Sequence, residues 1–161
     1  MDLPKFLCVV ALALVILAPA GFVQAQDELV GSWVLDPASS KAPPGMMPTG
    51  GTMEVTAAGE GKYTSVSEAA LGGVTGRTES TYSIDGKDYP VTATPGQPGA
   101  ALTQSIERVS DSVYKSSVKM NGQLLATAVT EVSSDRKTLT QTTTGLGQFA
   151  ALSSTMVFLR Q

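Results

Sequence analysis

Hydroxyl side chains are abundant in this sequence, but the groups that would activate them are scarce. The 161 residues include no histidine and one cysteine, Cys8. A serine or threonine becomes a nucleophile when a base lies within hydrogen-bond reach, and the available bases here are lysines. These lysines fall at expected turns or at strand positions that we expect to face solvent: Lys62, Lys87, Lys115, Lys119 and Lys137. We therefore predict no catalytic residues and no enzymatic activity.

A pair of carboxylates, Asp85 and Asp88, flanks Gly86-Lys87. Such a pair is suited to acid–base chemistry or to binding a hard cation. Calcium takes six or more oxygen ligands, however, and this segment offers only these two carboxylates. Asp-Gly is also typical of a tight turn, so we predict a turn rather than a site.

Three methionines, Met46, Met47 and Met53, lie close together in the sequence. Thioethers bind soft Cu(I), but no histidine or cysteine is at hand to complete such a site. Flexible methionine side chains also cover apolar openings, and we predict that role at the mouth of the barrel described below. We expect neither a metal nor a cofactor.

The charge balance excludes one class of partner. Lysine and arginine total 11 against 14 aspartate and glutamate, which gives a net charge of -3 and a pI near 4.8. Nucleic-acid-binding proteins neutralise phosphates with clustered basic residues. We therefore expect no nucleic-acid partner, and the sequence identifies no protein partner.

The N-terminus is typical of a secretory signal. Lys5 precedes an apolar run from Phe6 to Ala18, and Val23-Gln24-Ala25 places small residues before an expected cleavage after Ala25. The run is shorter than the roughly 20 residues that a membrane span requires. We predict a signal peptide at 1–25 and a single domain at 26–161 that is exported, periplasmic or secreted, and free of the membrane after cleavage.

The rest of the chain shows period-two alternation and no window with a 3.6-residue period. Turn signals such as Asn121-Gly122 divide it at the spacing typical of an antiparallel sandwich or barrel. A meander of strands avoids exposed edges by closing on itself, so we predict an all-β, antiparallel up-and-down barrel of about 8–10 short strands. The predicted strands span 29–35, 52–57, 63–70, 77–84, 89–94, 101–110, 112–120, 123–132, 138–144 and 150–160.

The first predicted strand contains Gly31-Ser32-Trp33, which resembles the Gly-x-Trp start of lipocalins, fatty-acid-binding proteins and related calycin barrels. The resemblance implies that Trp33 plugs one end of the barrel and that a basic residue of the last strand, Arg160, packs across it. Gly31, Trp33 and Arg160 are thus expected to close the barrel. One departure is that 36–50 is too short and too proline-rich for the two helices that fatty-acid-binding proteins insert there.

Most of the chain also resembles uncharacterised exported bacterial proteins of lipocalin-like type. The resemblance rests on Asp-Pro-Ala-Ser-Ser-Lys at 36–41, Asp-Gly-Lys-Asp-Tyr-Pro-Val-Thr at 85–92 and Asp-Arg-Lys-Thr-Leu-Thr at 135–140. It implies a lipocalin-like fold and an extracytoplasmic location, and it implies no established activity.

The barrel interior is the remaining candidate site. Small barrels either fill with side chains or enclose one small ligand. Many inward candidates have Ala, Ser and Thr neighbours, which leave room for a ligand. We therefore predict an extracytoplasmic binding protein for a small apolar or amphipathic molecule, with a cavity lined by Tyr82, Ile106, Tyr114, Val118, Leu125, Val129 and Met156.

An alternative from a different class is a filled barrel that acts as a protein-interaction or inhibitor module through the 36–50 loop. A third class, an outer-membrane barrel, needs two girdles of interfacial aromatic residues. The aromatic residues after Ala25 are too few for such girdles: Trp33, Tyr63, Tyr82, Tyr89, Tyr114, Phe149 and Phe158.

Overall fold

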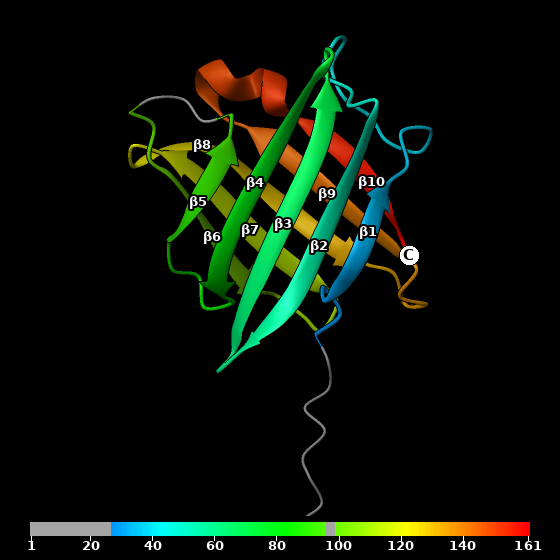
Figure 1. The fold of residues 1–161 in the computed structure, drawn as a ribbon, viewed down its shortest axis with the longest axis vertical. Coiled ribbons are helices and arrows are strands. Elements are labelled where there is room, and N and C mark those ends of the chain that lie inside the picture. The colour runs from blue at the N-terminus through cyan, green and yellow to red at the C-terminus, as the bar shows by residue number, and fades with distance from the viewer. Residues whose placement is uncertain (1–26, 96–98) are drawn as a thin grey trace, which may run out of the picture.

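A computed structural model describes residues 27–95 and 99–161 of the chain (Figure 1). The predicted signal peptide at 1–25 and its cleavage site lie outside the described residues. Within the described ranges the chain forms ten strands and one short 3-10 helix: β1 (Gly31–Leu35), β2 (Gly50–Gly59), β3 (Lys62–Leu71), β4 (Val74–Ser83), β5 (Tyr89–Thr94), β6 (Leu102–Arg108), β7 (Val113–Met120), β8 (Gln123–Val132), β9 (Thr138–Gly145), η1 (Gly147–Leu152) and β10 (Ser154–Arg160). No helix in these ranges has the length and apolar character needed to cross a membrane.

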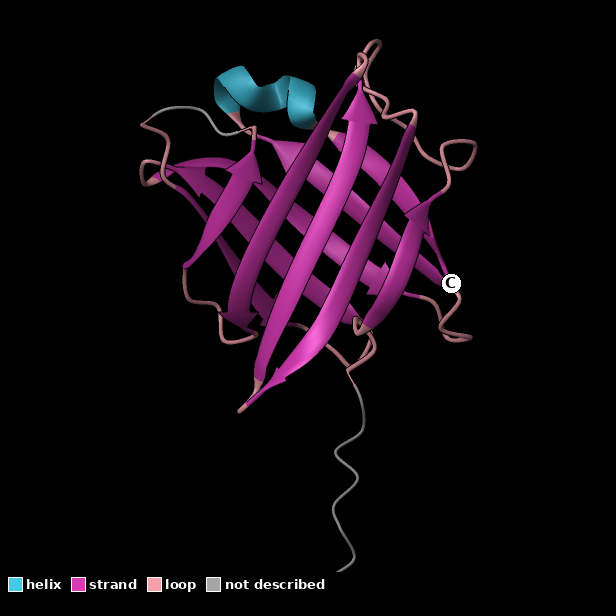
Figure 2. Cartoon of the chain, viewed as in Figure 1, coloured by secondary structure: helices cyan, strands magenta, loops and turns pink. Residues whose placement is uncertain are grey.

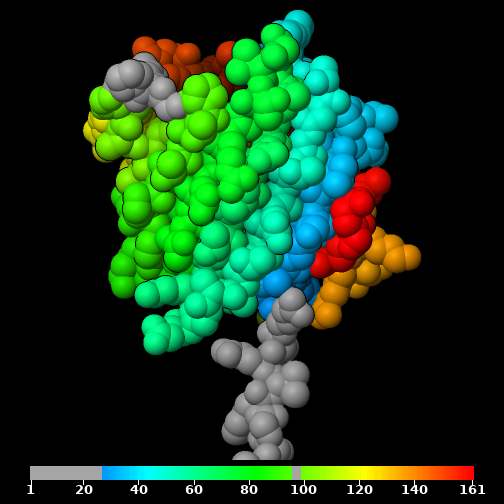
Figure 3. Space-filling view, viewed as in Figure 1, coloured from blue at the N-terminus to red at the C-terminus, as the bar shows by residue number. Residues whose placement is uncertain are grey.

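The sheet is a closed antiparallel barrel. Each strand pairs with its neighbours in chain order, and β10 pairs with β1 to close the circle. The closing register places Trp33 opposite Arg160 and Leu35 opposite Phe158. In the space-filling view the C-terminal strand, in red, lies against β1, in blue (Figure 3). The prediction of an all-β up-and-down barrel is confirmed.

The alternation of side chains explains why these segments form the wall of a barrel. In β4, Ser80 and Tyr82 are buried, whereas Glu79 and Thr81 between and beside them are exposed. Successive side chains of a strand point to opposite faces, so one set fills the interior and the other meets solvent.

The apolar core is concentrated at one end of the barrel. A cluster of buried side chains gathers where the chain enters β1, around Trp33, which is 1% exposed. The remaining members come from the chain before β1, from β2, from the start of β7, from the end of β8 and from the start of β9: Leu29, Val55, Tyr114, Val132 and Leu139. We call this end the packed end.

The helix η1 lies at the other end of the barrel, where it contacts β8 and β9 (Figure 2). The strand predicted at 150–160 begins at Ser154, so the prediction is wrong for 150–153. Phe149 N donates to Leu146 O and Ser153 N donates to Ala150 O, which is the bonding of a 3-10 turn. Gly147 takes a positive φ of 57°, which starts the turn.

The loop between β1 and β2 contains no helix, as its prolines predict. Its first half is tied to the last strand, because Lys41 and Thr155 exchange two backbone hydrogen bonds of 2.7 Å. Ser40 Oγ also accepts a hydrogen bond from Val157 N at 2.9 Å. The first half of the loop therefore packs along β10, and Thr49 at its other end donates to Ala70 O of β3 at 2.8 Å.

The hairpin between β7 and β8 has the predicted two-residue turn. Asn121 has φ 51° and Gly122 has φ 80°, as a type I′ turn requires at both central positions. Asn121 also links the turn to the residue before β6, since its Oδ1 accepts from Ala101 N at 2.9 Å and its N donates to Ala101 O at 2.8 Å.

Replacing Gly122 by valine should lower the free energy of unfolding by about 1–3 kcal/mol, because a β-branched residue resists positive φ. Chemical denaturation measures the change. The matched control is Gly122→Asn, since asparagine tolerates the left-handed region and should lose much less. An unchanged midpoint for Gly122→Val would contradict the turn conformation.

Candidate functional site

A cavity of about 310 Å³ lies inside the barrel. Its wall has an apolar part and a polar part. The apolar and aromatic side chains come from the chain before β1 and from β2, β4, β5, β6, β7 and β10: Leu29, Met53, Val55, Tyr82, Val91, Ile106, Tyr114 and Phe158. The polar part is formed by Thr52, Ser65, Ser67, Thr78, Ser80, Gln104, Ser116, Thr130 and Gln141, with Glu79 also at the wall.

Small polar residues on adjacent strands create the space. Ser65 pairs with Ser80 and Ser67 pairs with Thr78 across β3 and β4, so the inner face of this hairpin projects little side-chain volume. Large side chains here would have filled a barrel of this size. The amphipathic wall follows from the sequence, because hydroxyl residues alternate with outward residues in these strands.

Gln104, on β6, carries the one buried side-chain nitrogen or oxygen atom of the described residues that lacks a hydrogen-bond partner. The atom is Nε2, which has two N–H groups to donate. A buried donor without a partner costs about 1–3 kcal/mol, so the amide of Gln104 offers a hydrogen bond to an oxygen atom placed in the cavity.

Sequence reasoning missed Gln104. Its inward direction could have been predicted from the sequence, because Ile106, two residues further along β6, was predicted to point inward and side chains two apart share a face. Its missing partner depends on the residues opposite it, Tyr89 on β5 and Val118 on β7, and no local pattern reports that.

Of the residues predicted to line a cavity, Tyr82, Ile106 and Tyr114 do so. Val118 and Met156 hold inner-face register positions, opposite Gln104 and Gln141, but do not line this cavity.

The predicted inward direction of Val129 was wrong. Val129 lies opposite Lys115 and Thr142 on the outer face and is 42% exposed. Leu125 is buried but lies outside the cavity wall. The cause is a β-bulge: Ala126 pairs with Val118 and Leu124 with Lys119, so Leu125 is an extra residue that reverses the alternation of β8.

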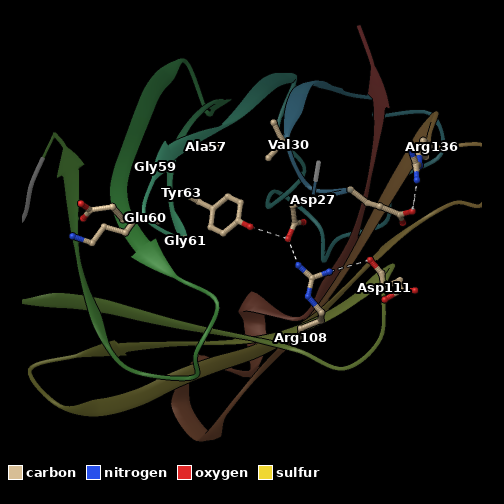
Figure 4. Close-up of a pocket in the computed structure, with 12 residues that line it drawn as sticks. Asp27, Val30, Ala57, Gly59, Glu60, Gly61, Tyr63, Arg108, Asp111 and Arg136 are labelled. Carbon is tan, nitrogen blue, oxygen red and sulfur yellow. Dashed lines mark hydrogen bonds and ion pairs between the residues drawn. The ribbon is translucent and has the colours of Figure 1, made fainter. Parts of the chain in front are cut away.

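At the packed end the Asp27 carboxylate lies at the centre of a polar cluster (Figure 4). Its side chain is 2% exposed and forms an ion pair with Arg108. Tyr114 donates its hydroxyl hydrogen to Oδ1 at 2.6 Å, and Tyr63 donates to Oδ2 at 3.2 Å. Leu29 N donates to Oδ1 at 3.1 Å, so both carboxylate oxygens are satisfied within the chain.

A larger pocket of about 580 Å³ surrounds this cluster, with charged residues such as Glu28, Lys62, Asp111 and Arg136 at its rim. Arg136 pairs with Glu28 at 3.2 Å. Because the central carboxylate already has its partners and the rim is charged and exposed, we assign this pocket to the closure of the barrel. The interior cavity is the better candidate for a ligand.

The expected contact between Trp33 and Arg160 is present beside this cluster. Arg160 Cζ lies 4.1 Å from the centroid of the Trp33 ring. The guanidinium also donates to three carbonyl oxygens: Glu28 O at 2.8 Å, Val30 O at 2.8 Å and Arg136 O at 2.6 Å. Gly31 has φ 149°, and a Cβ there would collide with the guanidinium, so this position requires glycine.

The carboxylates of the β4–β5 turn have separate partners, as a structural turn predicts. Asp85 accepts from Lys87 N and from the Tyr89 hydroxyl, both at 3.1 Å, and the backbone N–H of Lys87 holds the pKa of Asp85 below its usual range. Asp88 pairs with Lys119 at 2.7 Å. Within 27–95 and 99–161 no group of three or more His, Cys, Asp or Glu residues is placed to hold a metal ion.

The methionines do not act as one group. Met53 lines the cavity and packs against the core cluster. Met46 and Met47 lie in the β1–β2 loop and are partly exposed.

Burial raises the pKa of the tyrosines in and near the cavity. It raises that of Tyr82 to about 12. For Tyr114 the largest cause is burial, followed by its hydrogen bond to the Asp27 carboxylate, and for Tyr63 burial is followed by the negative charge of Asp27. Each folded-state shift favours the neutral phenol.

The free energy of unfolding should therefore fall as the pH rises from about 10, the usual tyrosine pKa, to about 12. In that interval the unfolded chain releases phenolic protons that the folded chain retains, so alkali favours unfolding. Urea denaturation at a series of pH values measures the slope, and Tyr82→Phe should make the slope shallower. The same slope in the Tyr82→Phe variant would contradict the assignment to Tyr82.

The closed barrel of ten antiparallel strands, with β1 and β10 adjacent and an internal cavity, has the fold of calycin-type barrels, of which fatty-acid-binding proteins are an example. No protein-family model and no curated protein matches this sequence.

Two solved structures illustrate the similarity of fold. The crystal structure of the N57A mutant of the fluorescent protein UnaG is 17% identical, with a TM-score of 0.59, over 83% of this chain and 96% of that chain. The fatty-acid-binding protein of Schistosoma mansoni in complex with arachidonic acid is 16% identical, also with a TM-score of 0.59, over 83% of this chain and 96% of that chain. At these identities the similarity concerns the fold, and the narrower resemblance to exported bacterial lipocalin-like proteins stays a prediction.

Proposed function

We propose that this protein is an exported, non-enzymatic binding protein that holds a small amphipathic molecule inside its barrel. The observation that carries the proposal is the cavity of about 310 Å³, whose wall combines apolar side chains with the unpartnered amide of Gln104. Ligand pockets are lined mainly by apolar groups with a few placed polar groups, and this volume is at the lower end of their range.

Two further points support a binding protein over an interaction module. The solved barrel from Schistosoma mansoni was obtained in complex with arachidonic acid, so a protein of this fold binds a fatty acid. The alternative of an interaction module required a filled barrel and a projecting 36–50 loop. The interior is not filled, and the first half of the loop is tied to β10 through Lys41.

Binding is tested with N-phenyl-1-naphthylamine, an uncharged anilinonaphthalene dye whose fluorescence rises when it enters an apolar site. Ser116 lines the cavity, so Ser116→Phe should reduce dye affinity at least about tenfold, which corresponds to about 1.4 kcal/mol. The matched control is Thr127→Phe, because Thr127 is exposed on the outer face of the adjacent strand. Equal dye affinity in both variants, or no dye binding by the unmodified protein, would contradict the proposal.

Export forms part of the proposal and rests on the apolar run at 6–18 and on the small residues before Gln26. Intact-mass measurement on protein purified from its native host should show a chain that begins at Gln26. A full-length mass in the soluble fraction would contradict cleavage after Ala25.

A further inference from the structure

Building on the proposed function, we infer that the ligand is electrically neutral and presents an acceptor oxygen to the amide of Gln104. The cavity then selects an alcohol or an ester over the carboxylate of the same chain.

The first argument is that no cation is available in the cavity wall formed by residues 27–95 and 99–161. Among the residues that line it, Glu79 is the one with a charged side chain. Its carboxylate is 52% exposed and pairs with Arg77 at 3.2 Å on the outer face. A carboxylate ligand drawn into this wall would find no opposite charge there.

The nearest arginines on the inner face are already engaged at the packed end. Arg108 forms the ion pair with Asp27 and donates from Nη1 to the Tyr114 hydroxyl at 3.1 Å. Arg160 donates to three backbone carbonyls and lies over the Trp33 ring. Recruiting either arginine to a ligand would leave the Asp27 carboxylate or those carbonyls without a partner, at a cost comparable to the gain.

The second argument is the hydrogen-bonding character of the wall. Gln104 Nε2 lacks an acceptor, and hydroxyls such as those of Ser116 and Thr130 can act as donor or acceptor. A carbonyl or hydroxyl oxygen satisfies this set without bringing a charge into the barrel.

The burial of Tyr82 supports the same conclusion. This side chain is 2% exposed and lines the cavity, and the wall around it also includes Val55, Ile106 and Phe158. An unpaired carboxylate in such surroundings loses its hydration, which costs far more than the loss of one hydrogen bond. A neutral oxygen at Gln104 avoids that cost.

The test compares decanol, methyl decanoate and decanoate at neutral pH as competitors of the bound dye. Decanol and the ester should compete at least about tenfold more strongly than decanoate. Decanoate competing as well as decanol would overturn the inference and leave the proposed function intact. Failure of the dye and of all three competitors to bind would overturn both.

The role of Gln104 is tested with Gln104→Leu, which keeps a similar volume and removes the donor. It should weaken decanol and methyl decanoate several-fold while leaving the dye, which lacks that oxygen contact, nearly unchanged. The control is Thr103→Val, since the neighbouring Thr103 does not line the cavity. Unchanged decanol affinity in a folded Gln104→Leu protein would overturn the contact, and the three-ligand comparison stands without this variant.

Discussion

Arg160→Ala should lower the free energy of unfolding by about 2–4 kcal/mol and shift the fluorescence of Trp33. The substitution removes the cation from the indole face and leaves the carbonyls of Glu28, Val30 and Arg136 without their donor. Because Trp33 is the only tryptophan, its emission reports this site directly. Chemical denaturation followed by tryptophan fluorescence gives both quantities.

The control for this prediction is Arg160→Lys. An ammonium keeps the charge but has neither the planar surface that stacks on the indole nor the geometry to reach three carbonyls at once. It should therefore recover only part of the lost stability. Full recovery by lysine would show that charge alone matters and would contradict the role given to the planar guanidinium.

Asp27→Ala should also lower the free energy of unfolding by about 2–4 kcal/mol, because it removes the acceptor shared by Arg108, Tyr63 and Tyr114. The Tyr114 side chain is buried, so its hydroxyl would lose its 2.6 Å partner without gaining full access to water. Urea denaturation measures the loss.

The matched control is Asp111→Ala, which removes an exposed carboxylate at the rim of the same pocket and should change stability by less than about 0.5 kcal/mol. Asp27→Asn separates the two contributions, since the amide oxygen still accepts from tyrosine but no longer pairs with Arg108. Equal stability of the Asp27→Ala and Asp111→Ala proteins would contradict the structural role of Asp27.

Most of the barrel could be predicted because its signals are local. Period-two alternation defines the strands, and residue pairs such as Asn121-Gly122 define where they reverse. The bulge at Leu125 could not be predicted, since it depends on how β8 pairs with β7, and it reversed the expected direction of Val129. The η1 helix could not be predicted, because the local sequence of Gly147–Leu152 is as compatible with a strand as with a 3-10 turn.

The candidate site also has a part that could be predicted from local signals and a part that could not. Tyr82, Ile106 and Tyr114 were found from alternation alone. The side-chain partners of Asp27 are 36, 81 and 87 residues away in the sequence, so no spacing rule brings them together.

The pairing of β1 with β10 closes the barrel, and it can form only when the last strand of the chain is present. The pairs between β1 and β10 join residues near the two ends of the described chain, so they have the largest sequence separation of all strand pairs in the barrel. The ribosome makes the chain from its N-terminus. Strand β1 can therefore pair with β2 early, but it cannot pair with β10 until Ser154–Arg160 has been synthesised. During that interval β1 and β9 are unpaired edges, and premature release of the chain before β10 would leave them open to pairing between molecules.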